Sequence, residues 1–190
     1  MNTPAHLIIA AAALASPKKP KVTGAAIVGA LIPDLSLYIL AAWSMFVQGN
    51  SAHYVFDTQY FSAEWQSIFA VDNSFVVWGL LIAIGFLLKK NWLWAFGIAG
   101  FLHLCCDFPL HHDDARQHFW PVSDWVFISP FSYWDHNHHG GLIGGIEIGL
   151  CLVLLILLWR RFKTRLARVI IILTALLQVA PGLMFRLMFQ

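Results

Sequence analysis

A histidine and an aspartate four residues apart are the strongest candidates for chemistry in this sequence. His103 and Asp107 lie in the run FLHLCCDFP, inside an apolar stretch. On an α-helix this spacing puts both side chains on one face, about 6 Å apart along the axis. Such a pair suits a zinc-type metal site, or a histidine whose tautomer is fixed by the carboxylate. A mutually satisfied polar pair that joins two helices is the structural alternative.

The run HHDD, at 111–114, follows this pair directly. Pro109 should loosen the helix before the run, so that its side chains can turn back towards Asp107. The candidate metal ligands in the run are His111 and His112. The candidates for a general base or an additional ligand are Asp113, Asp114 and His118. An exposed polar loop with a chance cluster of His and Asp is the alternative.

Two more carboxylates lie in apolar sequence, where an ionisable group is costly. Asp34 follows Pro33, and a proline that bends a helix leaves the carboxylate beside it facing a bundle interior or a water-filled pocket. A helix kink with a locally satisfied aspartate is the alternative. Glu147 lies in a later apolar stretch, where it either pairs with a histidine of the site or lies shallow in the membrane.

The composition places these side chains in a membrane protein. Of the 190 residues 59% are hydrophobic and 12% are charged, against about 25% charged in an average soluble domain. These values exclude a disordered chain and argue against an ordinary soluble globule. Stretches long and apolar enough to cross a bilayer occur at 22–47, 74–88 (extended back through 68–71), 92–110 and 141–159. A fifth, at 169–189, contains Pro181 and Gly182, which should kink or end it.

The N-terminal apolar segment at 4–15 contains His6 and is too short to cross a bilayer. It is therefore predicted to be a half-span, re-entrant or interfacial helix. Because lysines follow this segment and none precedes it, we expect it to be retained and not cleaved as a signal peptide. The sequence thus predicts an all-α polytopic transmembrane helix bundle, with about five spans plus this short helix, as a single membrane-embedded domain over 1–190.

The charges predict an orientation for the bundle. Ten of the 12 Lys and Arg residues lie in three loops that share one side if each apolar stretch crosses once, and that side is expected to be cytoplasmic. The outer loops hold most of the histidines. They contain a single Lys or Arg residue, Arg116. The outer segment 115–140 is rich in Trp, Phe and Tyr, so we expect it to lie on the membrane surface as a lid. Possible further ligands at its end are Asp135, His136, His138 and His139.

Three short motifs occur in order along the N-terminal two thirds of the chain: TPAHL at 3–7, GALIPD at 29–34 and HLCCD at 103–107. Together they resemble the LexA-regulated, YdjM-type inner-membrane metal-dependent hydrolases, a family distantly similar to zinc-dependent phospholipase C and P1-type nucleases. The resemblance implies an all-helical metal-binding core in a bacterial inner membrane, and phosphoester hydrolysis. The metal ligands that it implies are His6, Asp34, His103 and Asp107.

The sequence departs from that family at one motif. Asp72, Asn73 and Ser74 stand where the family has Thr-His-Ser, so that Asn73 replaces an imidazole. An amide is a poor substitute for an imidazole as a metal ligand. Either the HHDD run supplies substitute ligands, or the site no longer hydrolyses anything.

The first functional hypothesis is a membrane-bound, metal-dependent hydrolase, acting as a phosphoesterase on a lipid or lipid-linked substrate at the outer, periplasmic face. A divalent metal, zinc by its ligand types, would activate water for attack on phosphorus. Its candidate ligands are His6, Asp34, His103, Asp107, His111 and His112. No nucleic-acid partner is expected, and a homo-oligomer is left open. The alternatives are a metal- or proton-handling membrane protein, and a structural protein whose polar residues only join helices.

Overall fold

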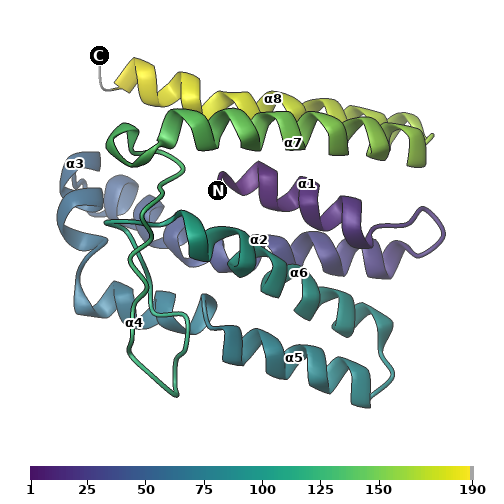
Figure 1. The fold of residues 1–190 in the computed structure, drawn as a ribbon, viewed down its shortest axis with the longest axis horizontal. Coiled ribbons are helices and arrows are strands. Elements are labelled where there is room, and N and C mark those ends of the chain that lie inside the picture. The colour runs from purple at the N-terminus through teal and green to yellow at the C-terminus, as the bar shows by residue number, and fades with distance from the viewer. Residues whose placement is uncertain (189–190) are drawn as a thin grey trace.

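The computed structural model describes the backbone of residues 1–188 and the side chains of residues 1–179. The described part is all-α, and its long helices lie side by side in one bundle (Figure 1). The long helices are α1 (Thr3–Leu14), α2 (Pro20–Ala42), α4 (Ala63–Asp72), α5 (Phe75–Leu87), α6 (Asn91–Asp107), α7 (Gly140–Arg161) and α8 (Arg165–Met188). The short helical segments are η1 (Trp43–Val47), α3 (Ala52–Tyr54), η2 (Val55–Gln59), η3 (Phe108–Leu110) and η4 (His136–His138).

Four helical stretches of the described chain are long and apolar enough to cross a membrane. They are Pro20–Val47, Ala63–Leu87, Asn91–Leu110 and Gly140–Arg161. The all-α membrane architecture is therefore confirmed at the level of fold class, with four candidate spans against the five expected. The predicted fifth span, 169–189, extends past the described side chains. The helix α8 does not end at Pro181 and Gly182, because its backbone continues to Met188.

The short N-terminal helix α1 lies inside the bundle, with α7 and α8 on one side and α2 and α6 on the other (Figure 1). Its sequence is apolar on every side, which suits a helix surrounded by protein. Alanines allow neighbouring backbones to approach, and Ala10 is buried in one cluster with Ala26, Ala30 and Ala99. This position carries His6, on the second turn of α1, into the core.

A glycine sets the distance between α2 and α6. A Cβ atom added to Gly29 would lie 2.2 Å from the backbone oxygen of Phe96, which no side-chain movement can relieve. The two helices can approach this closely because Gly29 has no side chain, and small residues serve this purpose in membrane bundles. The close approach also fixes the distance between the next residue, Ala30, and the site-bearing face of α6.

Replacing Gly29 with alanine should therefore destabilise the bundle by about 1–3 kcal/mol, the usual cost of overpacking. Thermal unfolding in detergent would show a lower melting temperature. Gly24→Ala is the matched control on the same helix, because a Cβ atom there meets nothing within 4 Å. An unchanged melting temperature for Gly29→Ala would show that α2 and α6 do not pack at this distance.

The second candidate span is broken in its middle. α4 ends at Asp72, Asn73 follows, and Ser74 caps α5 by accepting hydrogen bonds from the backbone N–H groups of Val76 and Val77. Ser74 is therefore the N-cap of α5. Interrupted helices inside a membrane are tolerated where protein or water satisfies the backbone. Here the break buries the Asn73 side chain inside the bundle.

The two ends of the bundle differ in charge. The turns between α1 and α2, α5 and α6, and α7 and α8 lie at one end, and these turns together with the helix ends beside them carry ten of the 12 basic residues (Figure 1). The segment between α6 and α7 crosses the other end, where the backbone N–H of Phe75 donates to His118 O at 2.9 Å. Exposed aromatic and aliphatic side chains on that segment include Trp120, Val122, Trp125, Ile128, Phe131 and Trp134.

Candidate metal centre

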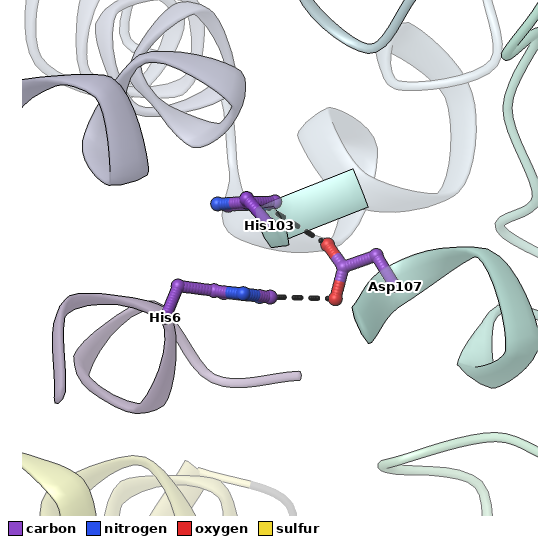
Figure 2. A group of neighbouring side chains, drawn as sticks. All are labelled: His6, His103 and Asp107. Atoms are coloured by element: carbon purple, nitrogen blue, oxygen red, sulfur yellow. Dashed lines mark ion pairs between the residues drawn. The ribbon is translucent and has the colours of Figure 1, made fainter. Parts of the chain in front are cut away.

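Three buried side chains from two helices converge towards the end of the bundle opposite the basic turns. His6 comes from α1, and His103 and Asp107 come from successive turns of α6 (Figure 2). His6 Nε2 lies 3.0 Å from Asp107 Oδ1, and His103 Nε2 lies 3.1 Å from Asp107 Oδ2. The two imidazole rings stack with their centroids 3.5 Å apart. We call these three residues the His–Asp centre; one ligand atom from each can be chosen so that all lie within 4.8 Å of one another.

The backbone of α2 orients His103. His103 Nδ1 lies 2.7 Å from Ala30 O, in the helical turn that precedes Pro33. Proline disturbs the carbonyl groups of the preceding turn, because its ring displaces them and it has no N–H to donate. A proton on Nδ1 that is donated to this carbonyl leaves the lone pair of Nε2 directed at Asp107. This tautomer is the one that a metal-ligating histidine needs.

Three of the four imidazole nitrogens of the His–Asp centre make no hydrogen bond. His6 Nε2 and His103 Nε2 are buried and have no partner at an acceptable angle, although carboxylate oxygens lie close to both. His6 Nδ1 is unpartnered too. Such buried polar groups are rare and costly. A mutually satisfied polar pair, the structural alternative for His103 and Asp107, would not leave these nitrogens without partners.

Two further side chains border the centre. His111 Nε2 lies 3.4 Å from Asp107 Oδ2, and His111 Nδ1 lies 2.9 Å from Asp114 Oδ2. Asp34 Oδ1 lies 3.6 Å from His103 Nε2. Ligands about 2.0–2.2 Å from a common tetrahedral centre lie about 3.3–3.6 Å from one another. The 3.4 Å distance from His111 to Asp107 and the 3.6 Å distance from Asp34 to His103 match that spacing better than they match hydrogen bonds of about 2.7–3.2 Å.

The Asp114 carboxylate orients His111 through its Nδ1 atom. Burial opposes a charge on His111, but Asp107 and Asp114 outweigh it and raise the pKa of this histidine. Burial likewise opposes the charge on Asp114, and the contact with His111 lowers the pKa of that carboxyl. A histidine backed by a carboxylate is the arrangement that commonly orients a metal ligand. Of the HHDD run, the structure therefore brings His111 and Asp114 to the centre.

The other predicted members of that run lie elsewhere. His112 stacks on His138, with ring centroids 3.6 Å apart, and its Nδ1 lies 2.6 Å from Ser129 O. Asp113 is exposed, and no hydrogen bond or ion pair joins it to the centre. His118 is buried between Phe75 and Phe108, with Nδ1 2.9 Å from Arg116 O. The structure thus gives none of these three a contact with the His–Asp centre.

Of the remaining open residues, His136 is exposed, and the others have structural partners. Asp135 Oδ2 lies 2.6 Å from His138 Nδ1, and His139 packs against Phe131. Glu147 is buried and accepts hydrogen bonds from the Asn2 side chain at 2.7 Å and from the Gln178 side chain at 2.6 Å. Glu147 therefore joins α7 to α1 and α8, and it pairs with no histidine among the described residues. The α-ammonium group of Met1 pairs with Asp107 Oδ1.

Burial lowers the pKa of His118 to about 4. In the unfolded chain the His118 imidazole is protonated below about pH 6.5, whereas in the folded chain it is protonated only below about pH 4. The free energy of unfolding should therefore fall as the pH drops through this window, and stay constant above it. His118→Phe should reduce the loss of melting temperature between pH 7 and pH 5. An identical loss in variant and wild type would show that His118 is not buried in its neutral form.

Arg116 and its hydrogen-bond partners form a buried polar group that was not predicted from the sequence. Arg116 is buried, and its guanidinium donates to Tyr60 Oη and to Asn73 Oδ1, both at 3.1 Å. The available signal was its isolation, because it is the one Lys or Arg in the outer loops. Asn73, the departure from the family motif, lies here as a hydrogen-bond partner of Arg116 and not as a metal ligand.

Comparison with family models, curated proteins and solved structures finds no match to this chain. The resemblance to the YdjM-type hydrolases accordingly stays a prediction from three short motifs. Any function must be inferred from the side chains themselves.

Proposed function

We propose that this protein is a membrane-bound, divalent-metal-dependent hydrolase, acting as a phosphoesterase on a lipid or lipid-linked substrate. The observation that supports this most is the buried His–Asp centre, whose Nε2 atoms converge on one carboxylate without hydrogen-bond partners. Catalytic zinc sites commonly combine imidazole with carboxylate ligands. Ionisable groups inside a membrane bundle are costly, and those that are present often mark functional sites.

The residues present fit a zinc-type ion. His6, His103 and Asp107 would hold it, with His111 or Asp34 close enough to join them. When bound, such an ion lowers the pKa of water and polarises a phosphoryl oxygen. The orphaned nitrogens of His6 and His103 would then have the partner that the protein alone does not give them.

The chain supplies candidates for proton transfer beside that centre. Asp114 orients His111, and its buried Oδ1 has no hydrogen-bond donor, so this oxygen is free to accept a proton. Asp113 is exposed and His118 faces a backbone carbonyl, so neither has comparable support as a general base. We therefore assign the predicted role of general base to Asp114.

The surroundings favour a substrate that lies in the membrane. The His–Asp centre lies at the end of the bundle opposite the basic turns, which by the positive-inside rule is the outer, periplasmic face of a bacterial inner membrane. The segment over this end exposes Trp120, Trp125 and Trp134, which suit the level of lipid headgroups. A lipid phosphate would reach the centre from the same layer.

A chelation experiment tests the proposal. Purified protein in detergent should release phosphate or a headgroup from lipid phosphoesters, lose this activity on treatment with a chelator, and regain it when zinc is added back. Phosphatidate and a polyprenyl phosphate would serve as substrates, because they share the phosphoester and differ in the lipid. Hydrolysis that resists chelation would contradict the proposal. Metal flux into proteoliposomes without hydrolysis would instead favour an ion-handling protein.

A further inference from the structure

Arg116 is the second unusual polar group of this protein, beside the His–Asp centre. Its side chain is 5% exposed, and among the described residues no carboxylate lies within ion-pair distance of it. Its hydrogen-bond partners, Tyr60 and Asn73, are neutral, and its guanidinium carbon lies 4.9 Å from the ring centroid of Phe69. A buried cation with only neutral partners is costly, so its position calls for a reason.

Both partners of Arg116 form hydrogen bonds with backbone atoms near residues that border the His–Asp centre. Asn73 Nδ2 donates to Pro33 O at 3.4 Å, in the peptide unit that joins Pro33 to Asp34. Tyr60 Oη donates at 3.1 Å to the backbone oxygen of Asp114, the residue that orients His111. The guanidinium is thus held by two residues that each bond to the backbone beside the centre, and it interacts electrostatically with Asp34 and Asp107.

The guanidinium group retains unused hydrogen-bonding capacity. Nε and Nη1 each make one hydrogen bond, which leaves three of its five N–H donors without an acceptor among the described residues. Burial opposes the charge, yet the neighbouring Tyr60 and Asp34 hold the pKa of Arg116 above its ordinary value, so the group is a permanent cation. A rigid planar fork with free donors matches the oxygens of a phosphoryl group.

We propose that Arg116 binds the phosphoryl group of the substrate beside the His–Asp centre, with Tyr60 and Asn73 as positioning residues. This inference rests on the proposed function and names the group that is recognised: a tetrahedral phosphate oxyanion, from a lipid headgroup or from free phosphate. The inference also explains the asparagine at position 73 as a residue that positions Arg116. An asparagine at the break between α4 and α5 accepts from Arg116 through Oδ1, which an imidazole at that position would do less well.

The test is phosphate binding and metal content measured on the same samples. Calorimetric titration with inorganic phosphate, and with phosphatidate in mixed micelles, compares wild type with Arg116→Gln. Removing a charged hydrogen-bond donor should weaken binding at least about tenfold, while the zinc content stays that of the wild type. Weaker binding of both ligands supports recognition of the phosphoryl group itself. Weaker binding of the micelles alone identifies a lipid headgroup as the source.

Two further variants keep the test decisive if Arg116→Gln does not fold. Arg116→Lys keeps the positive charge and loses the planar fork, so it should fold and still bind phosphate more weakly than the wild type. Arg161→Gln is the matched control, because Arg161 Nη1 donates to backbone oxygens at the other end of the bundle. Wild-type phosphate affinity in Arg116→Lys would overturn the inference and leave Arg116 as a counter-charge for nearby carboxylates. A wild type that binds phosphate but no metal would refute the proposed function and not this inference.

Discussion

Replacing Asp107 with asparagine should abolish both metal binding and hydrolysis while the bundle stays folded. Asp107 is the shared partner of the centre, because its two oxygens face His6, His103 and His111 within 3.0–3.4 Å. Asparagine keeps the size of the side chain but removes its charge. A ligand charge contributes several kcal/mol to metal-assisted chemistry, so we expect kcat/KM to fall at least about 10³-fold.

A matched control for Asp107→Asn exists elsewhere in the same chain. Asp57 pairs with His53 at the same four-residue spacing, 2.6 Å apart, but both side chains are largely exposed. Asp57→Asn should leave metal content and hydrolysis at wild-type levels, since an exposed pair of this kind contributes little. If Asp107→Asn kept its metal and its activity, the His–Asp centre would be a structural contact and the proposed function would fail.

Replacing His6 with phenylalanine should have the second large effect: it should raise the stability of the metal-free protein and abolish its metal binding. Both of its ring nitrogens are buried without hydrogen-bond partners, and each such group costs about 1–3 kcal/mol. His6→Phe removes them and keeps a flat ring stacked on His103. We therefore expect metal-free His6→Phe to melt at a higher temperature than metal-free wild type, and zinc to stabilise the wild type only.

His112→Phe serves as the comparison for this experiment. His112 is also a stacked histidine, but its Nδ1 bonds to Ser129 O at 2.6 Å, so replacing it should lower the melting temperature. Zinc should stabilise this variant as it does the wild type. A metal-free His6→Phe that melts well below the wild type would mean that His6 forms a structural hydrogen bond, and that the cluster is built for packing.

The elements of the centre that lie on helices could be predicted from the sequence. The four-residue spacing of His103 and Asp107 holds because α6 is regular across both, and Asp34 lies beside the proline that disturbs α2. Whether these residues meet depends on the packing of α2 against α6 at Gly29, which no local pattern reveals. His6 was predicted as a ligand from a resemblance, and its approach depends on α1 entering the bundle.

The loop residues could not be sorted from the sequence alone. His111 and His112 are adjacent and of one type, yet His111 contacts Asp107 and Asp114 whereas His112 contacts His138 and Ser129. Backbone atoms of Ser129 decide this, because its N–H donates to His111 O and its carbonyl meets the ring of His112. Contacts between residues 17 positions apart depend on the tertiary structure, so no local sequence pattern predicts them. Burial of Arg116 was not predicted, because a single basic residue in a loop is normally solvated.

The departure at Asn73 has a different meaning in the structure than in the sequence. As a motif change, it suggested a missing ligand and a site that had lost activity. In the folded chain, Asn73 bonds to Arg116, and His111 lies beside Asp107 as an additional imidazole. The position of His111 is compatible with the first of the two expected alternatives, in which the HHDD run supplies the substitute, and metal binding by His111 stays a prediction.

X-ray absorption spectroscopy at the zinc edge of the purified protein tests the central claim most directly. The proposed centre predicts about one zinc per chain, with nitrogen and oxygen ligands at about 2.0–2.2 Å and outer-shell scattering from at least two imidazoles, and loss of this signal in Asp107→Asn. Sulfur ligands at about 2.3 Å would instead place the metal at cysteines such as Cys105 or Cys106. That result, or a protein that binds no zinc at all, would contradict the account.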